Sequence, residues 1–388
     1  MKNLKSLSIM AVLVLVAVVG SVVMTPKISR SEELLPPVDK FALWTASSSF
    51  RGAVTAPSSN PSRRPEFGPT IDMTIEDLRA LKLAGANTVT LHYPGHFDIT
   101  APYNFNLANW NKLQDAVGWA WEVGLYVVIT VDTGPGRPGD DAFDFDGKDD
   151  TVWYSEGEQA LWVDMWKDLA TAFKDYPNVI GYDLMKEPHP ESTVILPPAP
   201  PMVWFDLAKR LTTAIRTVDT STPIIIESTV WGHPDTFPAI VPTGDTKTIY
   251  SFHMYTPNSF TTQGLVEYGT PIVYSYPGLM PSDDGTVEYW DKARIAKALL
   301  PVREFQTKHA VPIFVGEFGC NKKILSCINY LKDGMDLFEE YGWSHSFFAW
   351  RIDRDFDYEQ EPTGTVRVPE SSYMKMIKPY WAKNSYFF

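Results

Sequence analysis

Positive charge is scarce in this sequence, which has 34 lysines and arginines against 47 aspartates and glutamates and a formal net charge of −13. No basic stripe is available to neutralise phosphates, so the composition argues against nucleic acid as a partner. No G-x-G-x-x-G or Walker pattern opens any of the expected helices, which removes the usual nucleotide sites. We therefore expect no nucleotide, metal or redox cofactor.

Long apolar runs are also scarce, apart from one at the N-terminus that begins at Leu7 and ends at Met24. Two lysines precede it, Lys2 and Lys5, and this arrangement predicts that residues 1–24 are a secretory signal or an uncleaved membrane anchor. A buried core segment is the alternative. The lysines place the N-terminus inside, so the rest of the chain is expected outside the cytoplasm, secreted or anchored facing outward. Residues 25–40, rich in charge and proline, predict a tether.

Cysteine is limited to Cys320 and Cys327. No histidine cluster accompanies them, so the spacing does not predict a zinc site. Because an exported protein can form disulfides, we predict a bridge between the two residues, with two unpaired buried thiols as the alternative.

From residue 41 to residue 388, helical segments alternate with short apolar runs, without a linker or a change of composition. Alternating helices and strands imply a parallel sheet, and eight strands favour a single closed (β/α)8 TIM barrel over an open sheet. The expected helices are 78–84, 107–123, 158–174, 204–218, 287–309 and 335–341. The expected strands are 50–54, 87–92, 126–131, 179–185, 223–227, 248–255, 312–316 and 345–350.

Two glutamates, Glu187 and Glu317, follow directly after the fourth and seventh of these expected strands. The C-terminal ends of the strands are where the active sites of such barrels lie. A carboxylate is costly to bury there and has no packing role. Two facing carboxyl groups are the machinery of glycosidic bond hydrolysis.

The sixth expected strand places Ser251, His253 and Tyr255 on one face, where they would point into the barrel mouth with the glutamates. For His253 the alternative is a core histidine with satisfied hydrogen bonds. Trp350 ends the eighth strand and Trp231 lies just past the fifth. A tryptophan at the mouth offers a flat apolar face for a sugar ring, although both could instead be plugs in the core.

At three places the chain resembles clan A glycoside hydrolases, and most of all family 5, the cellulase and mannanase family. These places are the motifs Gly181-Tyr-Asp-Leu-Met-Lys-Glu-Pro188, Ser251-Phe-His-Met-Tyr-Thr-Pro257 and Phe314-Val-Gly-Glu-Phe-Gly319. The resemblance implies a (β/α)8 barrel and retaining hydrolysis, with Glu187 as acid/base and Glu317 as nucleophile. It also implies that His253, Tyr255 and Trp350 line the subsite at the cleaved bond, and that Tyr255 supports the nucleophile.

Three positions depart from the family pattern. Lys186 stands where the family has the asparagine that bonds the sugar 2-hydroxyl, Thr90 where it has an arginine, and Asp132 where it has a histidine. We expect Lys186 and Asp132 to contact substrate in their altered form. His92 lies on the same face as Thr90, and we expect it to make part of the polar contacts that the arginine makes in the family.

The expected function is retaining hydrolysis of a β-linked polysaccharide or oligosaccharide, with an endo-β-1,4-glucanase as the first choice. The alternatives are a non-catalytic polysaccharide-binding barrel and another clan A glycosidase, such as a mannanase, an exo-β-glucosidase or a transglycosidase. We expect a monomer, attached to a membrane through Leu7 to Met24 if that segment is not cleaved.

Overall fold

The computed structural model describes residues 39–45, 50–57, 72–138, 150–190, 200–265 and 269–385. The segment predicted to be a signal or anchor, and the tether up to residue 38, lie outside these residues. Within the described ranges, no helix combines the length and the apolar character that crossing a bilayer requires.

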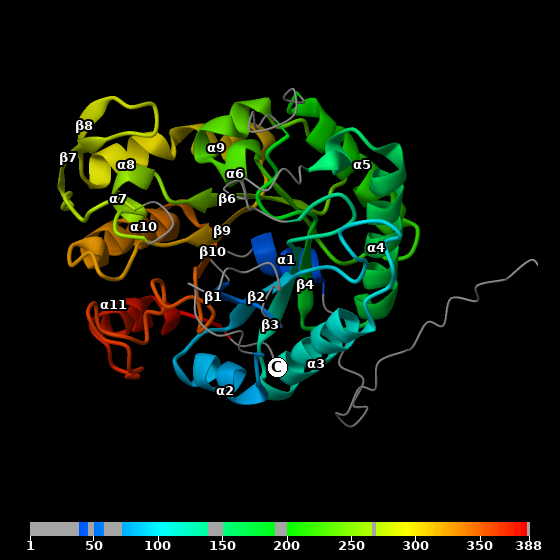
Figure 1. Cartoon of the computed structure of the whole chain (residues 1–388), viewed down its shortest axis with the longest axis horizontal. Helices are drawn as coiled ribbons and strands as arrows, with labels where there is room; N and C mark the ends of the chain where they lie inside the picture. The colour runs from blue at the N-terminus through cyan, green and yellow to red at the C-terminus, as the bar shows by residue number, and fades with distance from the viewer. Residues whose placement is uncertain are drawn as a thin grey trace, which may run out of the picture.

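Eight parallel strands form a closed barrel in the order β1-β10-β9-β6-β5-β4-β3-β2. The barrel lies at the centre of Figure 1. Every strand is buried along its whole length, which explains why the strands read as short, continuous apolar runs. The predicted barrel and its eight strands are confirmed. The strands are β1 Arg51–Thr55, β2 Thr88–Tyr93, β3 Tyr126–Val131, β4 Val179–Asp183, β5 Ile224–Glu227, β6 Thr248–Met254, β9 Ile313–Phe318 and β10 Ser344–Phe347.

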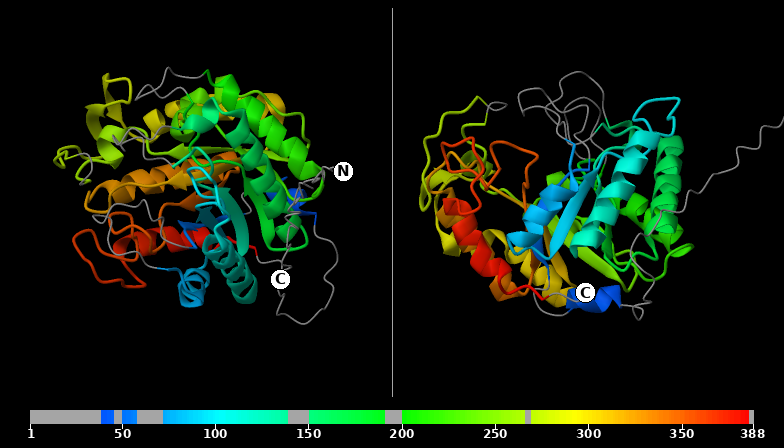
Figure 2. Two further views of the ribbon diagram at one scale, coloured as in Figure 1. Left: turned by 45° about the vertical axis from the view of Figure 1, so that its right-hand side comes forward. Right: turned by 90° about the horizontal axis from the view of Figure 1, so that it is seen from below.

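Helices surround the barrel, as both views of Figure 2 show. Two of them end at glycines in the left-handed conformation, Gly124 and Gly342, which turn the chain toward the next strand. The longer helices are α2 Ile75–Leu83, α3 Leu107–Val123, α4 Glu156–Phe173, α5 Met202–Arg216, α8 Lys292–Ala298, α9 Leu300–His309, α10 Cys327–Tyr341 and α11 Ser372–Trp381. The short ones are α6 Thr229–Gly232 and α7 Asn258–Thr261.

A short helix, α1 Lys40–Thr45, packs at the end of the barrel where the strands begin. The indole of Trp44 lies in a buried cluster with Phe50, Tyr126 and Phe314, and its Nε1 donates to the Ile180 carbonyl oxygen at 2.8 Å. The ammonium of Lys40 bonds Thr222 Oγ1 at 2.9 Å. Lys40 therefore belongs to the barrel domain, one residue earlier than the predicted boundary.

The predicted helix 287–309 is wrong over its first part. Residues Val287–Trp290 form β8, which pairs antiparallel with β7 Gly278–Pro281 in a separate hairpin. The helix begins only after Asp291, whose side chain accepts a hydrogen bond from the Arg294 main-chain N–H. Pro301 near the start of α9 divides the remainder into two helices. The hairpin stands at the outer side of the barrel beside α8 (Figure 1).

Candidate active site

Local backbone geometry aims the two predicted catalytic glutamates into the barrel mouth. Glu187 lies beyond the end of β4 with a φ of 49°, a left-handed conformation that is uncommon outside glycine. Where β6 pairs with β9, Phe252 lies opposite Val315 while the next residue, His253, lies opposite Glu317, so that Gly316 is the extra residue of a bulge in β9. A bulge re-aims the following side chain, and it brings Glu317 opposite His253. Both carboxyl groups are buried.

His253 lies between the two glutamates. Its Nδ1 is 2.8 Å from Oε1 of Glu187 and 3.8 Å from Oε2 of Glu317. One oxygen from each carboxyl group and one ring nitrogen all lie within 4.8 Å of one another. Of the residues that the structure describes, these three form the group whose donors converge closely enough for a metal ion, and within it His253 Nδ1 is already hydrogen-bonded to Glu187 Oε1. The cluster therefore places two carboxyl groups around one imidazole ring, and these are groups that can exchange protons.

The environments of the two carboxyl groups push their pKa values apart. Burial raises the pKa of Glu187 to about 8, against the hydrogen bond and positive charge of His253, and the charge of Glu317 raises it further. Burial also acts to raise the pKa of Glu317, but the charges of His253, His92 and Lys186 outweigh it and hold that pKa well below its usual value. Near neutral pH Glu187 is therefore largely protonated and Glu317 is ionised.

Two further side chains predicted to line the site contact Glu317. The Tyr255 hydroxyl donates to Oε2 at 2.6 Å, and His92 Nε2 lies 3.1 Å from Oε1. Burial and the charge of Glu317 raise the pKa of Tyr255 well above its usual value, so this residue is a donor throughout the working range. The prediction that His253 and Tyr255 face the two glutamates agrees with the observed geometry.

The three departures from the family pattern occupy different surroundings. Lys186 Nζ lies 3.3 Å from Oδ1 of Asp132, and both side chains are nearly buried beside Glu187. Thr90 is buried in the barrel wall and donates to Ser346 Oγ at 3.0 Å. The positive charge that an arginine would carry at position 90 is therefore absent there, while His92, on the same strand, contacts the nucleophile candidate.

The prediction that Trp350 presents its face to a sugar is wrong. Its side chain is 1% exposed, and its Nε1 donates to the Asp77 carbonyl oxygen at 2.9 Å, because β10 ends at Phe347 and the chain turns into the barrel wall. Phe348 is partly exposed and stacks on His92, with ring centroids 6.2 Å apart, so it is the aromatic residue at the mouth after β10.

Trp231, by contrast, is partly exposed. It has a left-handed backbone, with a φ of 56°, and its ring stacks on His189 at 4.9 Å between centroids. His189 in turn donates from Nδ1 to the main-chain oxygen of Glu187 at 2.7 Å. The Trp231 ring is thus placed next to the loop that carries the candidate acid/base.

The predicted disulfide is wrong, because Cys320 and Cys327 are both free thiols and both buried. The Cys327 Sγ donates to the Cys320 carbonyl oxygen at 3.4 Å, and the Cys320 Sγ lies 3.9 Å from the oxygen of Asn321. The alternative of two buried thiols is the observed arrangement.

Several residues of the site were not predicted from the sequence. Arg137 donates from Nη2 to the main-chain oxygen of Lys186 at 2.6 Å and pairs through Nη1 with Asp150, which fixes the loop before Glu187. Glu227, at the end of β5, and Asp183, at the end of β4, lie beneath His253. Both meet the criterion that singled out Glu187 and Glu317, a carboxyl group ending a buried strand, but the sequence analysis assigned a role to neither, although Asp183 lies within one of the quoted motifs.

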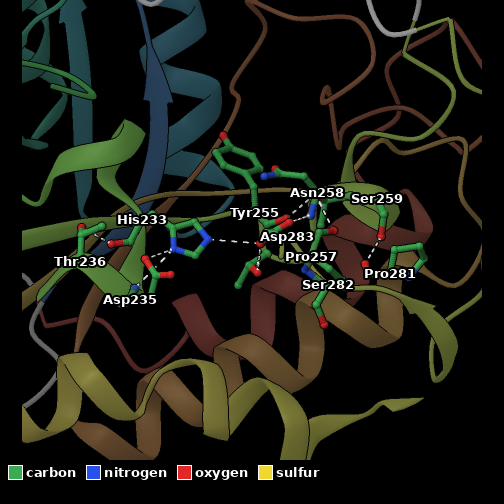
Figure 3. Close-up of polar contacts among 12 residues, drawn as sticks. His233, Asp235, Thr236, Tyr255, Pro257, Asn258, Ser259, Pro281, Ser282 and Asp283 are labelled. Carbon is green, nitrogen blue, oxygen red and sulfur yellow. Dashed lines mark hydrogen bonds and ion pairs between the residues drawn. The ribbon is translucent and has the colours of Figure 1, made fainter. Parts of the chain in front are cut away.

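The β7–β8 hairpin is joined to the mouth by Asp283, which lies in its turn (Figure 3). Asp283 accepts hydrogen bonds from Thr256 Oγ1 and from the Asn258 main-chain N–H, and its Oδ2 is 3.2 Å from Nε2 of His233. Burial lowers the pKa of His233, but the bonds to Asp235 and Asp283 prevail and raise it to about 9. The segments after β5 and β6 and the hairpin are thus held together by one aspartate next to Tyr255.

The closed barrel and the paired carboxyl groups define a glycosidase of the (β/α)8 type. Comparison with known proteins agrees, since the family described as Cellulase (glycosyl hydrolase family 5) matches residues 50–354. The chain belongs to glycosyl hydrolase family 5.

Individual relatives are distant. Endoglucanase C of Acetivibrio thermocellus is 25% identical over 244 residues, which cover 58% of this chain and 67% of that protein. An endoglycoceramidase of Cyanea nozakii is 32% identical over 123 residues, covering 27% of this chain and 23% of that protein. A hyperthermophilic endo-β-1,4-glucanase solved in complex with substrate is 21% identical, with a TM-score of 0.69 over 88% of this chain and 100% of that one, and it shares the fold.

Proposed function

We propose that this protein is a retaining endo-β-1,4-glucanase in which Glu317 is the nucleophile and Glu187 the acid/base. The observation that carries the proposal is the pair of opposed pKa displacements at short range, with Glu187 raised to about 8 and Glu317 lowered. Retaining enzymes place their carboxyl groups about 5–5.5 Å apart, whereas inverting enzymes leave room for a water molecule between them. The separation within 4.8 Å between one oxygen of each group favours the retaining arrangement.

In the first step Glu317 attacks the anomeric carbon while Glu187 gives its proton to the leaving oxygen, so the glycosidic bond breaks as the glycosyl-enzyme ester forms. In the second step Glu187, now ionised, takes a proton from water, which attacks the same carbon and releases Glu317. Tyr255 and His92 hold the Glu317 carboxylate from both of its oxygens and so orient the nucleophile. This two-step route needs no group beyond the side chains present.

The substrate assignment is supported by the family and by the relatives named endoglucanase. Trp231, Lys186 and Asp132 are the side chains that we propose to contact the sugar around the acid/base. A panel of soluble β-1,4-glucan, mannan, xylan, short cello-oligosaccharides and a glycosylceramide tests the substrate. Rapid loss of glucan viscosity supports endo action, whereas hydrolysis confined to oligosaccharides or to glycolipid overturns it.

The roles of the two glutamates are tested by substitution and leaving group. Glu317→Ala is expected to abolish hydrolysis of every substrate. Glu187→Ala is expected to abolish hydrolysis of glucan yet to retain substantial kcat/KM on aryl glycosides with good leaving groups, which need little protonation. Equal losses of Glu187→Ala on both substrate types contradict its role. Saturable glucan binding without any hydrolysis by the parent protein identifies a non-catalytic barrel instead.

We further propose that the protein acts outside the cytoplasm, which the N-terminal pattern from Leu7 to Met24 supports. Fractionation of cells and N-terminal sequencing of the native protein test this. Cleavage near Gly20, or recovery in the membrane fraction, is the expected result. Activity confined to the cytosol contradicts it.

A further inference from the structure

Glu227 is a carboxyl group that the two-step mechanism leaves unused. It ends β5, its side chain is 0% exposed, and it lies directly below the acid/base. In the described part of the chain, the cationic group within ion-pair distance of this carboxylate is His253, and neither a lysine nor an arginine accompanies it. Burying a carboxylate without such a partner costs free energy of folding, so we looked for a role of Glu227 in the site.

The two oxygens of Glu227 have separate partners, and both partners belong to the catalytic apparatus. Oε2 accepts the main-chain N–H of Glu187 at 2.9 Å. Oε1 lies 3.3 Å from Nε2 of His253, whose Nδ1 is 2.8 Å from the carboxyl group of Glu187. Glu227 thus contacts the main chain of Glu187 directly, and the imidazole ring of His253 connects it to the side chain of Glu187.

The bond to the Glu187 backbone also bears on its conformation. A non-glycine residue with a φ of 49° costs on the order of 1–3 kcal/mol and persists only where its surroundings hold it. Gly232 closes the opposite side, because a Cβ there would come within 3.1 Å of Glu227 Oε2 and 3.2 Å of the His253 main-chain nitrogen. The loop after β5 therefore packs onto the carboxylate and keeps water away from it.

Asp183 completes the group. It is buried next to Glu227, and its Oδ2 accepts the hydroxyl of Thr130 at 3.2 Å. Burial, followed by the charge of Glu227 and a hydrogen bond with it, raises the pKa of Asp183 well above its usual value. The raised pKa favours the neutral form of Asp183.

The charged and titratable groups that face His253 are Glu187, Glu227 and Glu317, with Asp183 behind them. Burial would lower the pKa of His253, but the charges of Glu227 and Glu317 overcome it and raise that pKa well above its usual value. Nδ1 of the ring faces Glu187 and Nε2 faces Glu227, so a protonated ring directs one N–H toward each carboxyl group.

We infer that Glu227 is a positioning residue for the acid/base: it fixes the backbone of Glu187, and it supplies the fixed counter-charge that keeps His253 a double donor oriented at the Glu187 carboxyl group. This inference rests on the proposed function, since it concerns the same acid/base step.

Glu227→Gln tests the inference, because glutamine keeps the size and an acceptor for the Glu187 N–H but removes the charge. We expect kcat/KM on unactivated cello-oligosaccharide to fall about 10- to 100-fold, and kcat/KM on an aryl cellobioside with a good leaving group to fall by less than about threefold. Glu339→Gln is the matched control: it breaks a partly buried pair with Arg51 at the far end of the barrel and should affect both substrates equally.

The second readout needs no variant of Glu227, because the protonation of the His253 ring can be observed in the parent protein. This second readout is the nitrogen spectrum of His253 in protein labelled with 15N-histidine, assigned with His253→Gln. The parent should show two protonated ring nitrogens at pH 7, and Glu227→Gln should lose one proton at a lower pH. A neutral ring in the parent, or equal losses of Glu227→Gln on both substrates, overturns the inference. If Glu187→Ala also lacks leaving-group dependence, the proposed function fails instead.

Discussion

Lys186 Nζ lies 3.3 Å from Oδ1 of Asp132, so two of the positions that depart from the family pattern form a single ion pair, in which Lys186 is next to Glu187 in the chain. Lysine and aspartate, which carry opposite charges, stand here where the family has an asparagine and a histidine. The two departures are therefore coupled, because each residue is the ion-pair partner of the other.

The first prediction concerns Lys186→Asn. The charge of Lys186 lowers the pKa of Glu187, so its removal should raise that pKa above about 8 and move the high-pH limb of the kcat/KM profile upward. Lys186→Arg keeps the charge and should leave the limb in place. A profile unchanged in Lys186→Asn contradicts the electrostatic role, and a lower kcat would point to an acidic or substituted sugar in the substrate.

The second prediction follows from the coupling. Lys186→Asn alone leaves the nearly buried Asp132 carboxylate without its ion-pair partner, whereas Lys186→Asn combined with Asp132→His removes both charges of the pair. Urea unfolding of the four proteins in a double-mutant cycle should give a coupling free energy of about 1–3 kcal/mol. Additive effects would indicate that the two side chains do not depend on each other.

The third prediction concerns Tyr255→Phe, which removes the hydroxyl that donates to Glu317 at 2.6 Å. A hydrogen bond to a charged group contributes about 1.5–3 kcal/mol, so kcat/KM should fall roughly 10- to 100-fold. The low-pH limb should move upward, since the carboxylate loses a donor that favours its ionised form. Tyr93→Phe, which alters a buried tyrosine elsewhere in the barrel, serves as the control.

The fourth prediction concerns the contact between His233 and Asp283. The pKa of His233 is raised to about 9, so its stabilising contribution is complete below about 6.5 and is lost as the pH rises through 9. The free energy of unfolding should fall by at most about 3 kcal/mol across that window. Asp283→Asn should reduce this fall, whereas Asp284→Asn, which changes an aspartate bonded to Thr286 instead, should not. An equal pH dependence in both variants contradicts the contact.

The fifth prediction concerns the cysteines. Because Cys320 and Cys327 are buried free thiols, neither should be alkylated in the native protein, and both should be alkylated after unfolding without reductant. Intact mass measurement distinguishes two adducts from none. A mass two hydrogens below that of the dithiol would restore the disulfide.

Much of the barrel could be predicted from the sequence, because its strands are buried on both faces and most of them follow shortly after a glycine or proline that ends the preceding helix or loop. The hairpin Gly278–Trp290 could not, since the exposed residues of β8 alternate with buried ones over four positions only and run directly into the cap of α8. The helix α11 was also missed, and Pro379 within it disguises a helical pattern.

In the site too, residues marked by the local sequence were predicted, whereas residues whose role depends on tertiary contacts were not. Glu187 and Glu317 are marked by their places at strand ends, and motifs around them reinforce the signal. Trp350 was misplaced because β10 ends three residues before it, and where a strand ends decides which side chain enters the mouth. The role of Glu227 depends on a distance to His253 across two strands, which no local pattern encodes.

The stereochemistry of the first product tests the central claim most directly. Proton NMR during the initial hydrolysis of a β-linked cello-oligosaccharide by the parent protein reports the anomeric configuration before mutarotation. The account predicts that the β anomer appears first and that the α anomer grows only slowly from it. Initial release of the α anomer would mean single-step inversion, and Glu317 could then not be the nucleophile.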